Sequence, residues 1–241
     1  MNVLSIGNSF SEDAQRYLHY VAKSAGVELN CFNLYIGGCS LSRHFRNMMS
    51  GERAYTLHMN GESTMLSVSL DDLLLNRDWD VITLQQASPD SPFYDRYQPY
   101  LDRLAAYVRE RVPKARIVIH QTWAYEDGSN RITSLGFSSR AEMFAAVKES
   151  YAKAAEAIAA DAVIPSGELL EELLRCGVTN LHRDGFHLSY GIGRYAVGML
   201  WYHVLTGRGV ADLCYSTLDE AISEREREIA KECIVKVAKA Y

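Results

Sequence analysis

The chain lacks the features that mark several protein classes, and each absence narrows what it can be. Its five cysteines are odd in number, scattered, and contain no Cys-x-x-Cys pair, so we expect reduced thiols rather than a disulfide framework. The 25 basic and 30 acidic side chains give a formal charge of -5, and neither sign clusters into a stripe that could follow a phosphate backbone. We therefore expect no nucleic-acid partner.

A long hydrophobic run is also missing. The longest apolar stretch, residues 196–205, is interrupted by Tyr202 and His203 and is too short to span a bilayer, so we expect no membrane segment. The N-terminus enters a strand-like pattern at once, without the basic and apolar regions of a signal peptide, which favours a cytoplasmic location. A chain from which a signal peptide had been removed would look the same.

What is present is the composition of an ordinary globular protein. The 241 residues are 48% hydrophobic and 23% charged, which predicts one domain over residues 1–241. Short apolar runs alternate with amphipathic segments, the pattern of a parallel sheet wrapped by helices. Five such strands are predicted, at residues 2–6, 28–36, 81–84, 116–120 and 162–164. The longer helices are predicted near residues 98–111, 140–160, 167–175 and 189–205.

Two segments stand outside this alternation. In residues 53–69 apolar side chains alternate up to Asn60-Gly61, which predicts a small β-hairpin insertion turned at that dipeptide. Residues 218–240 are strongly charged on one face and predict a terminal helix that covers the outside of the protein. The expected fold class is α/β, a three-layer α/β/α sandwich with a mostly parallel five-stranded sheet.

In an open parallel sheet, ligands bind beyond the carboxyl ends of the strands. Strand one ends at Gly7-Asn8-Ser9, where a tight turn before a helix can present an exposed serine hydroxyl. The helix N-terminus also supplies N–H groups for a developing oxyanion. Ser9-x-x-Glu12 fits a capping box equally well, in which case Ser9 only satisfies free amides. Both interpretations stay open from this segment alone.

The richest polar cluster lies far along the chain, at Asp184-Gly185-Phe186-His187. A carboxylate three residues before an imidazole can bind one ring nitrogen and leave the other free to take a proton from a serine. A salt bridge within the loop, or a packed histidine, would give the same pattern. A metal site of His182, Asp184 and His187 is a weaker alternative, because no HExxH motif or second ligand cluster accompanies it.

The order of these segments resembles the SGNH/GDSL hydrolases. Residues 3–10, which contain Gly7-Asn8-Ser9, resemble the first block of that family, residues 37–40 the second, and Asp184-x-x-His187 the last. The resemblance spans residues 3–206 and is closest to an uncharacterised bacterial branch with a Gln-Gln element after strand three. It implies a flavodoxin-like fold, Ser9 as nucleophile, His187 as base and Asp184 as its partner.

The third block departs from the family pattern, which has an asparagine as oxyanion donor. Here the strand continues Gln85-Gln86-Ala87-Ser88, and because glutamine carries the same amide one methylene farther out, we expect Gln86 to replace that asparagine. If Gln86 does not fill this role, Ser88 or Gln85 is the next candidate for the donor. The other expected donors to the oxyanion are the amides of Ser9 and Gly38.

The resemblance implies an esterase without cofactor or metal that acts on short acyl esters, most often O-acetyl groups of carbohydrates. Its partner would be a small-molecule or glycan ester, and the sequence does not indicate an oligomeric state. Two other functions remain, a flavodoxin-like phosphate or nucleotide-binding module and an inactive glycan-binding relative. Three side chains after strand four are expected to line the substrate pocket, namely His120, Trp123 and Tyr125.

Overall fold

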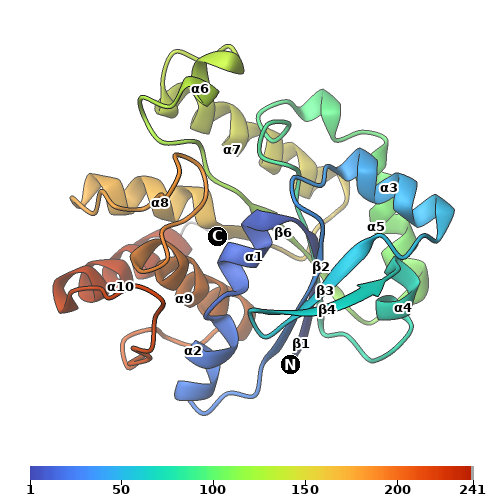
Figure 1. Cartoon of the computed structure of the whole chain (residues 1–241), viewed down its shortest axis with the longest axis horizontal. Helices are drawn as coiled ribbons and strands as arrows, with labels where there is room; N and C mark the ends of the chain where they lie inside the picture. The colour runs from blue at the N-terminus through green and yellow to red at the C-terminus, as the bar shows by residue number, and fades with distance from the viewer. Residues whose placement is uncertain (240–241) are drawn as a thin grey trace.

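The computed structural model describes residues 1–239, which are built around one mixed β-sheet (Figure 1). The strand order is β4-β3-β2-β1-β5-β6-β7. Five neighbouring strands run parallel, namely β2, β1, β5, β6 and β7. Strand β3 pairs antiparallel with β2, and β4 pairs antiparallel with β3. The strands are β1 (Asn2–Gly7), β2 (Asn30–Tyr35), β3 (Tyr55–Met59), β4 (Glu62–Val68), β5 (Val81–Leu84), β6 (Arg116–Gln121) and β7 (Ala162–Pro165).

The central strands are apolar because both of their faces are covered. Val3 and Leu4 in β1 and Val81 and Ile82 in β5 are completely buried, as expected for parallel strands between two helical layers. The order reverses at β1, where the chain moves to β2 on one side and later to β5 on the other. Such a switch point opens a crevice at the carboxyl ends of β1 and its neighbours.

The prediction of a five-stranded sheet with a separate hairpin is wrong in one respect, because the hairpin joins the sheet. Strand β3 pairs antiparallel with β2 from Phe32↔Met59 to Tyr35↔Thr56, which gives seven strands. The turn lies where it was predicted, with φ angles of 52° at Asn60 and 84° at Gly61. The edge of β2 would otherwise expose unpaired backbone groups, and the hairpin satisfies them.

Helices form a layer on each face of the sheet (Figure 1). One layer contains α1 (Ser9–Gln15), α2 (Leu18–Ser24), α8 (Ser166–Arg175), α9 (Ile192–Thr206) and α10 (Glu224–Ala238). The other contains α3 (Leu41–Ser50), α4 (Leu70–Leu74), α5 (Tyr100–Arg111) and α7 (Arg140–Ala157). Two short elements lie in the loops at the carboxyl edge, η1 (Tyr94–Arg96) and α6 (Asn130–Ser134). The predicted α/β/α layering is therefore present.

The C-terminal helix is shorter than expected. It begins after the cap Ser223, whose side chain accepts a hydrogen bond from the N–H of Glu226, so residues 218–223 precede it as irregular chain. The predicted end at Ala240 lies outside the described residues. Within residues 1–239 no helix is long and apolar enough to cross a membrane.

Candidate active site

Ser9 is the first residue of α1, directly after the turn that ends β1. The helix is capped by Asn8, not by Ser9, because the Asn8 Oδ1 accepts a hydrogen bond from the N–H of Phe10 at 3.0 Å. The reciprocal half of the capping box comes from Ser11, whose Oγ accepts from the Asn8 N–H at 3.0 Å. The alternative interpretation, a capping box of Ser9 and Glu12, is therefore wrong by one residue. The Ser9 hydroxyl is consequently not used to cap the helix.

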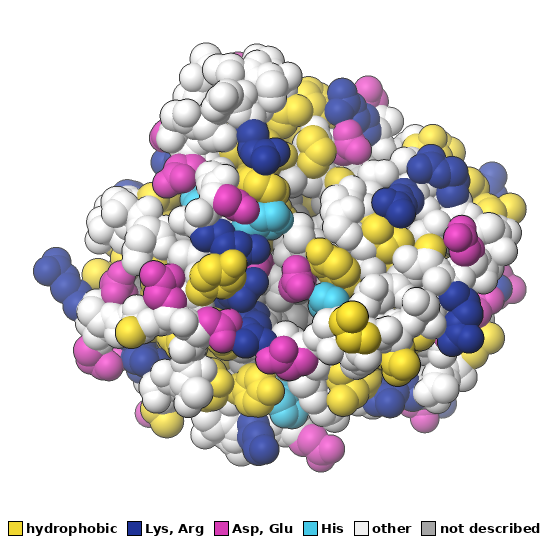
Figure 2. Space-filling model, in the orientation of Figure 1, with side chains coloured by type: hydrophobic (Ala, Val, Ile, Leu, Met, Phe, Trp, Pro, Cys, Tyr) yellow, Lys and Arg dark blue, Asp and Glu magenta, His cyan; other side chains and the backbone are white. Residues whose placement is uncertain are grey.

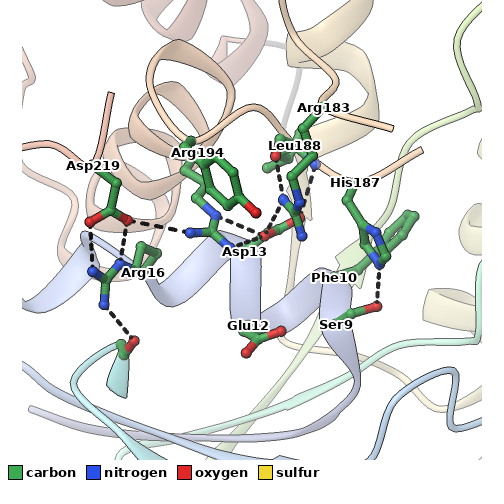
Figure 3. A network of polar contacts seen from close by, with 12 residues as sticks. Ser9, Phe10, Glu12, Asp13, Arg16, Arg183, His187, Leu188, Arg194 and Asp219 are labelled. Carbon is green, nitrogen blue, oxygen red and sulfur yellow. Dashed lines mark hydrogen bonds and ion pairs between the residues drawn. The ribbon is translucent and has the colours of Figure 1, made fainter. Parts of the chain in front are cut away.

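The structure brings Ser9 next to His187 although 178 residues separate them (Figure 3). The His187 Nε2 lies 2.9 Å from the Ser9 Oγ, and the His187 Nδ1 lies 2.7 Å from the Asp184 Oδ2. Because a carboxylate accepts only, Nδ1 carries the ring proton and Nε2 is left as the acceptor for the serine hydroxyl. The three side chains form one continuous hydrogen-bonded chain.

The Asp184 carboxylate is fixed by the turn on which it lies. Its Oδ1 accepts from the backbone N–H of His187 at 2.8 Å and of Phe186 at 3.3 Å, while Oδ2 is directed at the imidazole. Partial burial acts to raise the pKa of Asp184, but these hydrogen bonds outweigh it and hold the pKa below the usual value. Gly185, with a φ of 85°, lets the loop fold back in this way.

A buried ion-pair network ties the His187 loop to α1 (Figure 3). Asp13, one turn after Ser9, is completely buried and contacts Arg183 at 2.9 Å and Arg194 at 2.8 Å. Its Oδ2 also accepts from the N–H of Leu188 at 2.9 Å. Since Leu188 adjoins His187 and Asp13 shares a helix with Ser9, this carboxylate fixes the distance between the two sides of the site.

Ser9 and His187 open onto a pocket of about 360 Å³. Of the predicted site residues, Gly38, Ser88 and Tyr125 line it as well. Gly38 adopts a φ of 62°, which favours glycine at this position. The Tyr125 hydroxyl donates to the Ser88 Oγ at 3.0 Å, and this leaves the serine proton free to point elsewhere. Figure 2 shows that basic and acidic side chains are interspersed over this face of the molecule.

Neither glutamine of the Gln-Gln element reaches the pocket, contrary to the prediction. The Gln86 Oε1 accepts from the N–H groups of Leu41 and Ala87, and its amide donates to the carbonyl of Arg96. The Gln85 amide donates to the Asn8 Oδ1 at 2.7 Å. Both side chains are buried and hold loops together, so the expected replacement of the family asparagine by Gln86 is wrong.

His120 also lies behind the pocket and does not line it. It is completely buried, with Nδ1 2.6 Å from the Gln85 Oε1 and Nε2 3.1 Å from the Ser166 Oγ. An amide oxygen only accepts, so His120 donates from Nδ1 and receives the Ser166 proton at Nε2. Burial lowers the pKa of His120 to about 3 and keeps it neutral. Through Gln85 it supports the cap residue Asn8.

Trp123 is a second supporting residue that was predicted to line the pocket. Its ring is buried and stacks on Phe10 with centroids 4.2 Å apart, and its Nε1 donates to the carbonyl of Phe186 at 2.8 Å. It therefore packs beneath both sides of the site.

Several lining residues were not predicted from the sequence. Asn8 and Phe186 adjoin the two motifs and could have been found from that position alone, whereas nothing in the sequence marked Tyr35 or Arg131. Among residues 1–239 the donor atoms of His182 do not cluster with those of Asp184 and His187. The described residues with metal-ligand spacing are instead Glu172, Cys176 and Cys233.

The sequence matches a family model described as "Domain of unknown function (DUF4886)" over residues 2–237. The chain belongs to this family. A crystal structure of a DUF4886 family protein from Bacteroides uniformis shares 33% identity and a TM-score of 0.92, covering 99% of this chain and 95% of that one. No curated protein matches the sequence.

More distant solved structures share the fold of this chain. A protein proposed to be an SGNH hydrolase, from Slackia heliotrinireducens, has a TM-score of 0.60 at 22% identity and covers 84% of this DUF4886 chain and 97% of its own. An acetylxylan esterase from Geobacillus stearothermophilus has a TM-score of 0.54 at 15% identity, with coverages of 86% and 92%. The fold is that of the SGNH hydrolases, and the resemblance stated from the sequence is confirmed.

Proposed function

We propose that this DUF4886 protein is a serine esterase in which Ser9 is the nucleophile. The observation that carries the proposal is the chain from Ser9 Oγ to His187 Nε2, at 2.9 Å, and from His187 Nδ1 to Asp184, at 2.7 Å. These distances lie within reach for direct proton transfer. A phosphate-binding module has no need of such a chain, so the hydrolase accounts for more of the site.

The reaction divides into two steps. Ser9 Oγ attacks the ester carbonyl while His187 Nε2 takes its proton, and the imidazolium then protonates the leaving alcohol as the C–O bond breaks. In the second step water attacks the acyl-enzyme, gives its proton to His187, and Ser9 leaves with that proton. Asp184 orients the ring and stabilises its positive charge in both steps.

The oxyanion that forms in each step needs donors inside the pocket. Ser9 begins a helix, so its N–H has no intrahelical acceptor, and Gly38 lines the same pocket. We assign the third donor to Ser88, because its hydroxyl lines the pocket and accepts its own hydrogen bond from Tyr125. Gln86 has no part in this assignment.

The substrate we propose is a short acyl ester, with an O-acetyl group on a carbohydrate as the leading case. A pocket of about 360 Å³ is at the small end of ligand sites and suits a short acyl group. The likeness to an acetylxylan esterase supports the same choice at the level of fold. No cofactor or metal takes part in the proposed steps.

The test is hydrolysis of 4-nitrophenyl acetate and acetylated xylan by wild type, Ser9→Ala and His187→Ala. Wild type should turn over at least one of them, and each variant should lose about 10³-fold or more in kcat. The matched control is Ser216→Ala, an exposed serine outside the pocket, which should behave like wild type. Equal rates for wild type and Ser9→Ala, or no turnover of any acetyl to butyryl ester, would contradict the proposal.

A further inference from the structure

The inference concerns the class of ester and rests on the proposed function. Among the residues that line the pocket, Arg131 is the one with a permanent charge; the others are neutral or aromatic, or are His187 itself. The chain as a whole carries a net charge of -5, so this positive group is not part of a general excess. Arg131 is exposed and lies at the edge of the pocket, where its charge can meet a bound substrate.

Arg131 is held over the pocket by the loop that carries it. Arg131 lies on α6, and the side chain of the cap residue Ser129 accepts a hydrogen bond from its backbone N–H. The loop that leads into α6 is bound to the His187 loop, because the Glu126 N–H donates to the Gly185 carbonyl at 2.8 Å. The guanidinium carbon lies 4.0 Å from the centroid of the Phe186 ring, which in turn lies 3.8 Å from the centroid of the His187 ring. One aromatic ring therefore separates the positive charge from the catalytic base.

The guanidinium has no carboxylate partner among residues 1–239. The structure records ion pairs for arginines elsewhere, including Arg140 with Glu171 and Arg183 with Asp13, but none for Arg131. Its recorded side-chain contact is the face of Phe186. Stacking uses the flat face of a guanidinium and leaves its N–H edge free for acceptors in the plane.

We propose that Arg131 binds an anionic group of the substrate, so that the preferred esters carry a carboxylate or a comparable anion near the scissile bond. The planar fork of arginine matches a carboxylate with two parallel hydrogen bonds. The anion can belong to the acyl group or to the alcohol, and the experiment separates these two sources. In the carbohydrate case, the acetylated sugar would itself be acidic or adjoin an acidic sugar.

The test compares anionic esters with neutral ones of similar shape. The acyl arm uses 4-nitrophenyl succinate against 4-nitrophenyl butyrate, and the alcohol arm uses 3-acetoxybenzoate against 3-acetoxybenzamide. For each pair the ratio of kcat/KM, anionic to neutral, is measured in wild type, Arg131→Gln and Arg131→Lys. Because both esters of a pair are measured on the same variant, the ratio cancels any general damage to folding or to the catalytic groups. The control variant is Arg103→Gln, which replaces an exposed arginine on α5.

We expect the ratio to fall about tenfold in Arg131→Gln on at least one arm, as for loss of one charge-assisted hydrogen-bonded contact. Arg131→Lys should keep part of the preference, and Arg103→Gln all of it. The arm that responds identifies which portion carries the anion. In wild type, added NaCl should raise KM for the responding anionic ester, and this dependence should weaken in Arg131→Gln.

A change of less than twofold on both arms, or an equal change in Arg103→Gln, would overturn the inference. Failure of the proposed function has a different signature, since wild type would then hydrolyse none of the four esters. In that event binding of both anionic esters and of their two neutral counterparts to Ser9→Ala protein, measured by calorimetry, still tests Arg131. Tighter binding of the anionic ester in at least one pair, abolished by Arg131→Gln, supports the inference, and equal affinities within both pairs refute it.

Discussion

Replacement of Asp13 by asparagine is the sharpest test of how the two halves of the site are held together. Asp13 is completely buried, and its two oxygens accept from Arg183, Arg194 and the N–H of Leu188. Asparagine has nearly the same shape, but one of its two acceptors becomes an NH₂ that must face a donor. The two arginines, 19% and 10% exposed, would also lose their shared counter-charge.

The expected loss can be worked from this geometry. Breaking a buried charge pair by removal of one partner costs about 3 to 5 kcal/mol, because the other charge remains buried and unpaired. Among residues 1–239 this applies to Arg183, whose recorded ion pair is with Asp13, whereas Arg194 keeps Asp219 at 3.4 Å. Unfolding entropy of about 2.1 cal/mol/K per residue gives roughly 0.5 kcal/mol/K for a chain of this length. Asp13→Asn should therefore lower Tm by roughly 6 to 10 °C.

The assay is thermal unfolding followed by circular dichroism at pH 7, with Asp219→Asn as the matched control. Asp219 belongs to the same network through Arg16 and Arg194, but its side chain is 36% exposed. Exposed pairs contribute up to about 1 kcal/mol, so the control should lose no more than about 2 °C. A loss of less than 2 °C in Asp13→Asn, or equal losses in the two variants, would refute the reasoning.

Three further predictions follow from the site. Ser88→Ala should lower kcat for 4-nitrophenyl acetate about 10²-fold, because an oxyanion donor is lost, and Tyr125→Phe should lower it less. A kcat of Ser88→Ala within threefold of wild type would contradict the assignment of Ser88. Gly7→Ala should lower Tm by several degrees, because the new Cβ would lie 2.0 Å from the Ser11 Oγ of the helix cap. Gly209→Ala is the control and should keep the Tm of wild type, because the space around Gly209 is open. Equal Tm values for the two variants would contradict the predicted clash. Burial lowers the pKa of His120 to about 3, so between pH 6.5 and 5 the histidine takes up a proton in the unfolded chain but not in the folded one. Urea unfolding of wild type should therefore show a free energy of unfolding that falls by roughly 2 kcal/mol over this range, and His120→Gln should not show this fall. The same pH dependence in wild type and His120→Gln would contradict the prediction.

Much of the fold and of the proposed catalytic chain could be predicted because the signals are local. The strand at residues 81–84 agrees with β5 at both ends, and the turn of the hairpin lies at Asn60-Gly61 as predicted. The dipeptide needs positive φ at both residues, and that is a property of the residues themselves. Pairing of the hairpin with β2 is a long-range contact, and the sequence of the hairpin does not specify its partner.

The errors at the site arose where a local sequence pattern does not fix the exact start of a helix, the direction of a side chain or a distant partner. Ser9 and Asn8 are both good cap residues, and a sequence pattern places a helix start only to within a residue or two. For Gln86, the residue type was suitable but the direction of its side chain depends on loops contributed by Leu41 and Arg96. Asp13 was not predicted at all, because its arginine partners lie 170 and 181 residues away in the sequence.

The central claim is that Ser9 is the nucleophile, and the most direct measurement is the mass of its adduct. The protein is incubated with a fluorophosphonate, digested, and searched for the modified peptide. The account predicts one adduct per chain on the Ser9 Oγ, no adduct in Ser9→Ala, and much slower labelling in His187→Ala. An adduct on another residue, or labelling that persists in Ser9→Ala, would contradict it.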